Sequence, residues 1–307
     1  GSHAVQTAQI MQRFEPVLDE KTPDAVLVVG DVNSTIACAL VAVKKGVPVV
    51  HVEAGLRSGD RSMPEEINRI LTDQLSEQLF ITEKSARENL LREGVDARRI
   101  HFAGNVMIDT LKFNLSKAVP ADQLLKEHLK HKRETAPIAY GLVTLHRPSN
   151  VDDPARLKAL LELLRELAND LPLVFPVHPR TRLVIERSGL GELIRNGRLF
   201  SFPPVGYLEM LGLMKDARLV LTDSGGIQEE TTALGVPCIT LRENTERPVT
   251  VEEGTNTITG TDPQLIRKVF REIMDNGGKR GRIPELWDGC AAERIVAQLE
   301  TWLAQRA

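Results

Sequence analysis

Cysteines, aromatic residues and long apolar runs are all scarce in this 307-residue sequence. The three cysteines, Cys38, Cys238 and Cys290, lie far apart and form no C-x-x-C or Cys/His pattern. The sequence therefore indicates neither a disulfide framework nor a zinc site, and we expect reduced, buried thiols and no metal. Because no apolar run approaches the roughly 20 residues of a membrane span, we expect a cytoplasmic protein without a membrane partner.

Positive charge is not in excess either. The formal net charge is -3 and the isoelectric point about 6.2. No sequence-wide field therefore attracts nucleic acid, and any anionic ligand must be bound locally. The length, with 42% hydrophobic and 26% charged residues, suits a globular protein of two domains, each with its own core.

Apolar, β-branched runs alternate with segments of helical periodicity almost from the start. Residues 25–31 and 47–53 are predicted as strands, and residues 33–45 as the helix between them. Continuous apolar strands joined by a crossover helix predict parallel pairing and a sheet covered on both faces. The chain is thus expected to be α/β, with a second strand and helix array after Thr135-Ala136-Pro137.

Further elements follow the same alternation. Helices are predicted at 64–77, 85–93, 121–133, 154–169, near 181, and at 207–215, 227–234 and 291–306. Strands are predicted at 79–82, 100–102, 140–146, 172–178, 198–202, 218–223 and 237–241.

Two acidic residues follow neighbouring predicted strands. Asp31 and Glu53 should emerge at the carboxyl edge of one parallel sheet, where ligands of open α/β folds bind. Two carboxylates close together split their pKa values, which suits one to accept a proton while the other delivers one. For Asp31, a helix cap before residues 33–45 is an equally good interpretation.

A second acidic group begins the helix predicted at Pro64. Glu65 and Glu66 lie in its first turn, where the usual explanation is compensation of the helix dipole. A catalytic role for Glu65 and Glu66 is favoured only because Asp31 and Glu53 are also candidates. Arg69, four residues after Glu65, has a simple i,i+4 ion pair as its alternative.

The segment RLVLTDSGGIQEE predicts a phosphate-binding turn. A strand leads through Ser224, Gly225 and Gly226 directly into a helix, so the backbone can approach an anion and present unpaired N–H groups to it. Glu229 and Glu230 lie within reach of ribose hydroxyls in this arrangement. For both glutamates, helix-dipole compensation is an equal alternative.

Two histidines and a loop complete the candidates. His146 ends a predicted strand and precedes Arg147, a pair suited to a diphosphate or to acid–base work. His178 also ends a strand, and for both histidines a hydrogen-bonded boundary residue is the simpler alternative. His51, inside a strand, is expected in the core, whereas the polar loop 243–248 could close over a sugar or base.

Eight motifs, in order, carry a family resemblance: VVGDVNST, HVEAGLRSGD, MPEEINRILTD, GNVMIDTL, TLHRPSN, PVHPRTR, TDSGGIQEE and TERP. Together they resemble the bacterial non-hydrolysing UDP-N-acetylglucosamine 2-epimerases, from about Ala4 to the C-terminus. The resemblance implies a GT-B fold of two Rossmann-like domains facing across a cleft. It also implies inversion at C2 of the N-acetylglucosamine unit through UDP elimination and re-addition, without a nicotinamide cofactor or a metal.

The resemblance also implies roles for individual residues. The expected catalytic residues are Asp31, Glu53, Glu65 and His146. The expected UDP-binding residues are His146, Ser224, Gly225, Gly226 and Glu230. The residues expected to line the pocket or a second, effector pocket are Arg69, Arg147, His178 and Arg247.

The same resemblance implies an organisation. We expect an N-terminal Rossmann-like domain at 1–118, a UDP-binding domain at 119–290 and a helix at 291–307 that crosses back to the first domain. The family's opening strand with its GTRPE-type loop and its GQH-type segment have no counterpart here, so the first domain is expected to lack its N-terminal strands. Because bare strand edges favour aggregation, we expect omission or disorder of that segment rather than a domain built without it.

Partners and alternatives complete the expectations. The resemblance implies a UDP-sugar substrate that also acts as an activator. It also implies a homodimer. A GT-B glycosyltransferase and an inactive nucleotide-sugar sensor are the alternatives from other functional classes. Within the family, a UDP-diacetamido uronic acid is the alternative substrate, although TERP favours plain N-acetylglucosamine.

Overall fold

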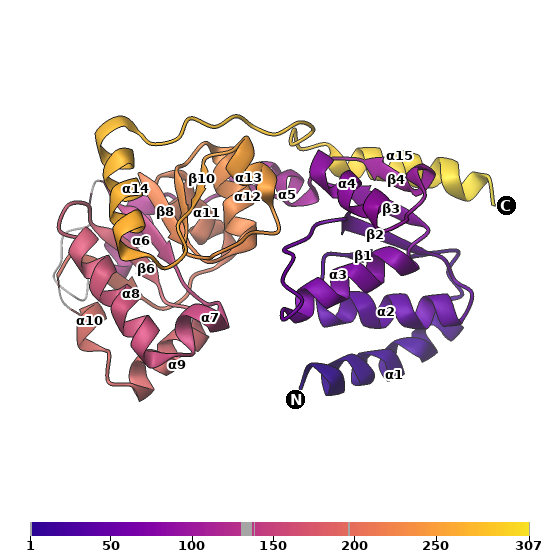
Figure 1. Ribbon diagram of the computed structural model, residues 1–307, viewed down its shortest axis with the longest axis horizontal. Coiled ribbons are helices and arrows are strands. Elements are labelled where there is room, and N and C mark those ends of the chain that lie inside the picture. Colours follow the sequence, from indigo (N-terminus) through magenta and orange to yellow (C-terminus); the bar gives the residue numbers. More distant parts are fainter. Residues whose placement is uncertain (1, 130–136, 138, 196, 307) are drawn as a thin grey trace. The chain divides into compact units, whose positions relative to one another are not determined.

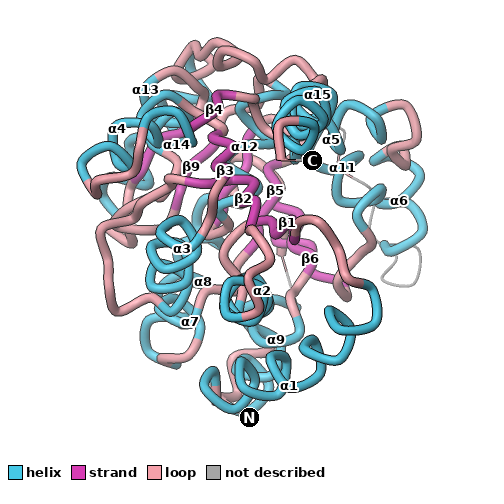
Figure 2. Tube along the Cα trace, turned by 90° about the vertical axis from the view of Figure 1, so that its right-hand side faces the viewer, coloured by secondary structure: helices cyan, strands magenta, loops and turns pink. Residues whose placement is uncertain are grey.

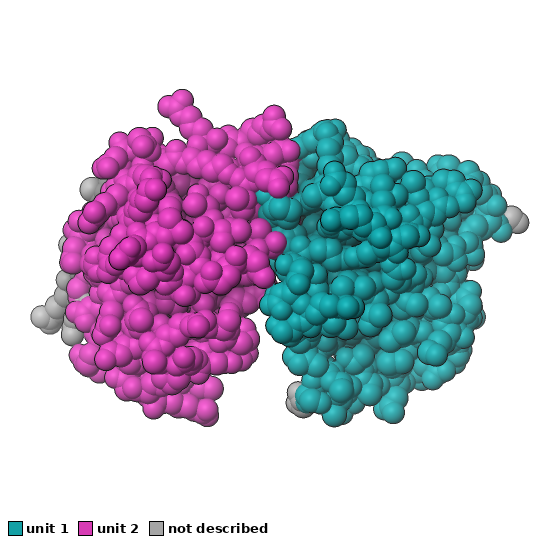
Figure 3. Space-filling model, in the orientation of Figure 1, with its two compact units in different colours: residues 1–109, 246–248, 285–307 teal, residues 110–245, 249–284 magenta. Residues whose placement is uncertain are grey.

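The computed structural model describes residues 2–129, 137, 139–195 and 197–306. The chain forms two compact units, coloured separately in Figure 3. Unit 1 comprises residues 1–109, 246–248 and 285–307, and unit 2 comprises residues 110–245 and 249–284. Each unit contains one parallel sheet with helices, so the predicted α/β class is confirmed.

Unit 1 is built on a four-stranded parallel sheet in the order β1-β2-β3-β4 (Figure 1). Its strands are β1 (Val26–Val29), β2 (Val49–Ala54), β3 (Gln78–Ile81) and β4 (Ile100–Phe102). Its helices are α1 (His3–Lys21), α2 (Asn33–Lys44), α3 (Pro64–Leu75), α4 (Lys84–Arg92), the 3-10 helix at Ala97–Arg99 and α15 (Ala291–Ala304).

Alternating side chains of this sheet pack against different helices, because successive residues of a strand point to opposite faces. Val26, Val28 and Val49 join α1 and α2 in one cluster. Val50 and Val52 join residues of α15 in another. The last helix is therefore part of the core of unit 1, and its first turn is capped by Asp109, which accepts the N–H groups of Ala291 at 3.1 Å and Ala292 at 2.7 Å.

Unit 2 contains a six-stranded parallel sheet in the order β10-β9-β8-β5-β6-β7. Its strands are β5 (Gly141–Thr144), β6 (Leu173–Pro176), β7 (Leu199–Phe202), β8 (Leu219–Thr222), β9 (Cys238–Thr240) and β10 (Asn256–Ile258). Its helices are α5 (Val106–Leu115, starting in unit 1), α6 (Ala121–Leu129), α7 (Pro148–Val151), α8 (Pro154–Leu167), α9 (Pro179–Arg187), α10 (Glu192–Arg195), α11 (Tyr207–Lys215), α12 (Gly225–Leu234), α13 (Pro248–Glu252) and α14 (Pro263–Asn276).

The strand order of unit 2 is that of a Rossmann fold. Counted from β5, the sheet reads 3-2-1-4-5-6, and the direction of winding reverses between β5 and β8. Residues of α8 and α14 pack on one face of the sheet and residues of α6 and α11 on the other; helices are cyan and strands magenta in Figure 2. One face buries Val143, Phe175 and Leu221 and the other Leu142, Val174 and Val220, so the central strands β5, β6 and β8 are apolar on both sides.

Most predicted elements are present. Many are shorter than predicted, whereas α12 starts two residues earlier, at Gly225, and the bounds of α11 and β4 are as predicted. The helix predicted at 121–133 is observed to Leu129, and its residues 130–133 lie outside the described part of the chain. Helices α5, α7, α10, α13 and α14 and strand β10 were not predicted. The predicted domain limits after residues 118 and 290 stay predictions.

The three cysteines are free, but only Cys238 is fully buried. Cys38 and Cys290 are partly exposed, so the expectation of buried thiols is right for one of the three.

Replacement of Phe175 by Ala tests the packing of unit 2. Phe175 lies in β6 and is fully buried, so the variant should lose about 3–5 kcal/mol of the free energy of unfolding of unit 2. Chemical denaturation followed by circular dichroism measures this loss. Phe113→Ala is the matched control, because Phe113 is 70% exposed; equal losses for the two variants would contradict the core assignment.

Candidate functional site

The structure brings Asp31 and Glu53 to the same edge of the sheet of unit 1. Strands β1 and β2 are parallel neighbours with Val29 opposite Val52. Asp31 lies two residues after β1, and the intervening Gly30 donates its N–H to the carbonyl of Val52 at 3.0 Å. The two carboxylates interact electrostatically, since the charge of Asp31 raises the pKa of Glu53.

Glu53 is the last residue of the predicted strand 47–53, but the observed β2 continues one residue further, to Ala54. The pairing of β2 with β3 shifts register between Val52 and Ala54, so Glu53 is the extra residue of a β-bulge. Its φ is 70°, in the left-handed region that non-glycine residues seldom adopt. Strain of this kind persists only where the surrounding structure imposes it, and it concentrates at functional sites.

The side chain of Glu53 is held by Arg247. The Arg247 Nη2 donates to the Glu53 Oε1 at 2.7 Å, and its Nη1 donates to Glu246 at 2.7 Å. Glu53 is 9% exposed. Burial raises the pKa of Glu53 more than the Arg247 guanidinium lowers it, and the Asp31 carboxylate raises it further. Glu53 is thus a carboxyl group whose proton affinity is increased, as general acid–base catalysis near neutral pH requires.

Asp31 is not a helix cap. The residue that caps α2 is Val32, which accepts no hydrogen bond with its side chain. Instead, Asp31 Oδ2 accepts a hydrogen bond from Arg69 Nε at 2.9 Å and forms an ion pair with Arg69 Nη2 at 2.8 Å. The capping alternative is therefore excluded, and Asp31 belongs to an ion-paired group at the strand edge.

Arg69 connects Asp31 to Glu66, not to Glu65 as the i,i+4 alternative supposed. Arg69 is 2% exposed, and its Nη1 donates to Glu66. Glu66 also accepts the backbone N–H groups of Ser58 at 3.0 Å and Gly59 at 2.9 Å. Its role is thus to anchor the loop before α3, because a buried carboxylate is stable only when its oxygens are paired.

Glu65, the third predicted acid–base residue, faces a different environment. It lies in the first turn of α3 and is half-buried. Among the described residues it makes no hydrogen bond or ion pair. Its carboxylate is therefore available to a ligand, while that of Glu66 is not.

In unit 2, the predicted phosphate-binding turn lies at the switch point of the sheet. Ser224 follows β8 as the N-cap of α12, and Gly225 and Gly226 form the first turn of that helix. The N–H of Ser224 is bound by Thr222 Oγ1 at 2.9 Å. The N–H groups of the first helical turn have no acceptor inside the helix, so they and the helix dipole favour an anion there.

His146 lies beside this turn, after β5, the strand next to β8. Asp223 accepts the backbone N–H of His146 at 3.0 Å and that of Arg147 at 3.0 Å, and its carboxylate lies 3.1 Å from His146 Nδ1. Burial raises the pKa of Asp223, but these hydrogen bonds and the imidazole outweigh burial and lower it. With the ionised carboxylate as acceptor, Nδ1 carries the proton and Nε2 is left for a ligand.

His178 and Arg147 both begin helices. His178 is the N-cap of α9, and its Nδ1 accepts the N–H of Arg180 at 3.2 Å. The His178 ring lies 5.4 Å from that of His146, centroid to centroid, and burial followed by the charge of His146 lowers the pKa of His178. Arg147 is the residue before α7 and is half-buried.

Glu230 is buried on the second turn of α12, outside the first turn, so helix-dipole compensation does not explain it. The Tyr207 hydroxyl donates to Glu230 Oε1 at 3.0 Å. Burial raises the pKa of Glu230 more than this hydrogen bond lowers it. Glu229 is fully buried on the same helix and is likewise outside the first turn.

Several buried polar residues of unit 1 escaped prediction as site residues. They are Glu66, Asn68, Thr72 and Asp73, all buried on α3, whereas the apolar Leu71 of the same helix is 47% exposed. Polar residues at helical spacing in MPEEINRILTD were the available signal. An isolated helix with that pattern would expose them, so only the tertiary fold reveals their burial.

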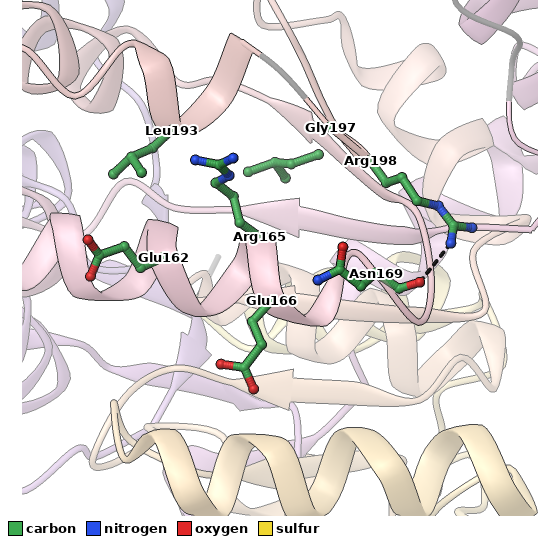
Figure 4. A pocket seen from close by; sticks show the side chains of 8 residues that line it. Glu162, Arg165, Glu166, Asn169, Leu193, Gly197 and Arg198 are labelled. Atoms are coloured by element: carbon green, nitrogen blue, oxygen red, sulfur yellow. Dashed lines mark hydrogen bonds between the residues drawn. The ribbon is translucent and has the colours of Figure 1, made fainter.

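A cavity of about 370 Å³ in unit 2 contains none of the candidate residues (Figure 4). It lies between α8, α10 and the start of β7, and there Arg198 donates to the carbonyl of Asn169 at 2.7 Å. Because all strands are parallel, the start of β7 lies at the edge opposite His146 and Ser224. Ligands of such sheets bind at the carboxyl edge, so this cavity is not part of the candidate site.

Within the described part of the chain, no helix is both long and apolar enough to cross a membrane. The same residues contain no group of three or more His, Cys, Asp or Glu side chains placed to hold a metal ion.

Comparisons with known proteins agree with this geometry. Residues 1–300 match the family model described as UDP-N-acetylglucosamine 2-epimerase. The chain is 44% identical to the UDP-N-acetylglucosamine 2-epimerase of Methanocaldococcus jannaschii, over 96% of this chain and 80% of that one. It is 43% identical to the UDP-2,3-diacetamido-2,3-dideoxy-D-glucuronate 2-epimerase of Pseudomonas aeruginosa, over 97% and 81%.

A solved structure extends the likeness to the fold. The crystal structure of the Methanocaldococcus jannaschii UDP-GlcNAc 2-epimerase in complex with UDP-GlcNAc and UDP matches with a TM-score of 0.87 and 43% identity, over 98% of this chain and 82% of that one. The predicted fold class, GT-B with two Rossmann-like parts, is confirmed: each unit has a parallel sheet with helices, and the matching structure is a UDP-GlcNAc 2-epimerase. The chain belongs to the UDP-N-acetylglucosamine 2-epimerase family.

Proposed function

We propose that this isomerase interconverts UDP-N-acetylglucosamine and UDP-N-acetylmannosamine by reversible epimerisation at C2. The observation that carries this proposal is the buried carboxyl group of Glu53, whose pKa is raised and which adjoins Asp31 on a strained bulge. A positioned carboxylate can remove a proton from the carbon next to a departing phosphate, and a second acidic group can return one. The names of the relatives supply the sugar nucleotide.

The proposed reaction has two steps, the elimination of UDP and its re-addition. In the first, a carboxylate takes the C2 proton, the C2–H electron pair forms the C1=C2 double bond, and the C1–O bond breaks to release UDP. In the second, the UDP oxygen bonds again to C1 of the 2-acetamidoglucal while a proton returns to C2 from the opposite face.

The acid–base work falls to Asp31, Glu53 and Glu65 of unit 1. Arg69 and Arg247 bind Asp31 and Glu53, respectively, so we propose that they orient these carboxylates. Two carboxylates with separated pKa values can divide the roles of proton donor and acceptor. Glu65, which makes no hydrogen bond or ion pair to a described residue, is the third candidate.

Unit 2 is proposed to bind UDP. Ser224, Gly225 and Gly226 receive the diphosphate at the start of α12, His146 lies beside the same group, and Glu230 binds the ribose hydroxyls. The N–H groups and dipole of the helix start also stabilise the charge that UDP gains on leaving. Arg147 and His178 are proposed to line the same ligand or a second, effector nucleotide.

The 3-acetamido uronic acid analogue is the second candidate substrate. The identity to the epimerase of that name, 43%, nearly equals the 44% to the N-acetylglucosamine enzyme. Both candidates share the chemistry at C2 and differ at C3 and C6 of the sugar. The homodimer, activation by the substrate, the cytoplasmic location and the two domain limits also remain predictions.

Deuterium exchange at C2 tests the proposed reaction. Incubation with UDP-N-acetylglucosamine in heavy water should place deuterium at C2 and form UDP-N-acetylmannosamine, which proton NMR resolves. A parallel incubation with the diacetamido uronic acid nucleotide compares the two substrates through kcat/KM. If neither nucleotide exchanged its C2 proton, the result would contradict the proposal and favour a glycosyltransferase or a sensor.

Replacement of Glu53 by Gln tests the group that carries the proposal. The amide preserves size but cannot act as a general acid or base, so C2 exchange should fall at least about 100-fold. Melting should change little, because Arg247 keeps its ion pair with Glu246. Glu20→Gln, on an exposed glutamate, is the control; an active Glu53→Gln enzyme, or one that fails only by unfolding, speaks against the assignment.

A further inference from the structure

His51 and Asp73 form an ion pair in the interior of unit 1. Both side chains are wholly buried, and His51 Nδ1 lies 2.6 Å from Asp73 Oδ1. The other ring nitrogen, Nε2, lies 2.9 Å from the backbone carbonyl of Gly30. The second oxygen of Asp73 accepts the N–H of Gly55 at 3.1 Å and lies 2.7 Å from Arg57 Nη2.

These contacts hold the backbone next to both catalytic carboxylates. Gly30 directly precedes Asp31, and Gly55 follows Glu53 by two residues. Asp73, on α3, thus reaches the end of β1 through the His51 ring and the end of β2 directly. One buried carboxylate fixes the two segments whose relative position sets the distance between Asp31 and Glu53.

The bulge has little space in which to relax. Gly55 has a φ of 79°, and a Cβ added there would lie 2.6 Å from the carbonyl oxygen of Ala86. Gly55 therefore cannot carry a side chain, and on the same residue the N–H is held by Asp73 at 3.1 Å.

Stability alone is a weak reason for this pair. Burial of two charges costs several kcal/mol per ion, and well-packed apolar residues often replace such pairs without loss. Burial lowers the pKa of His51, but Asp73 outweighs it and the net pKa is raised, so the ring favours its charged form. In that form both ring nitrogens donate, one to Asp73 and one to Gly30.

We infer that Asp73 is a positioning residue of the acid–base site, which acts through His51 and Gly55 to hold Asp31 and Glu53 in register. The inference rests on the proposed function, since it assigns those two carboxylates to proton transfer. Displacement of a catalytic group by about 1 Å can cost about 100-fold in rate. Binding of UDP by unit 2 should be unaffected.

Two variants separate positioning by hydrogen bonds from the effect of charge. Asp73→Ala removes the contacts to His51, Gly55 and Arg57 and should lower kcat for C2 exchange at least about 30-fold, with KM for UDP-N-acetylglucosamine changed less than about threefold. Asp73→Asn can donate to a neutral His51 and accept from Gly55, so it should recover kcat to within about fivefold of wild type. An Asn variant as inactive as the Ala variant, while folded, would overturn positioning in favour of charge.

Asp109→Ala is the matched control. Asp109 also lies in unit 1 and also accepts backbone N–H groups, but those of α15. It should lower the melting temperature and leave kcat of the folded enzyme unchanged. Wild-type exchange is measured first, because its absence would defeat the proposed function, whereas full kcat in folded Asp73→Ala enzyme would defeat only the positioning role.

Discussion

The buried ion pair between Glu53 and Arg247 constrains the organisation of unit 1. A carboxylate that is 9% exposed requires a partner, since an unpaired charge in such a place would cost several kcal/mol or remain protonated. The partner comes from a segment 194 residues away. Residues 246–248 accordingly belong to unit 1 although both neighbouring stretches of chain belong to unit 2.

The candidate residues of the two units lie in different surroundings. Unit 2 has an apolar sheet, and its candidate groups lie at the strand ends, where a Rossmann order leaves a switch point for a ligand. Unit 1 instead carries polar groups into its interior, on β2 and α3. Glu53, Glu66 and Asp73 are each bound by Arg or His there, which fixes their positions at the expense of apolar burial.

Periodicity was sufficient to predict the α/β class and most of the elements, because apolar strands and crossover helices alternate regularly. It was also sufficient to bring Asp31 to the end of β1 and Ser224 to the start of α12. It did not predict the bulge at Glu53, because a register shift arises from pairing with β3 and leaves no mark in the local sequence. The partners of the carboxylates were equally hidden: Arg69 pairs with Glu66 rather than Glu65, and Arg247 reaches Glu53 only through the tertiary fold.

Titration of the Glu53 carboxyl group tests most directly whether burial prepares it for proton transfer. Protein labelled with carbon-13 at the glutamate side-chain carboxyl can be followed by NMR, with the Glu53 signal identified by its loss in the Gln variant. A midpoint above the roughly 4.3 of an ordinary glutamate is predicted, because burial and Asp31 outweigh Arg247. A midpoint at or below that value would contradict the account, since Glu53 would then be a structural partner of Arg247 and not an acid–base group.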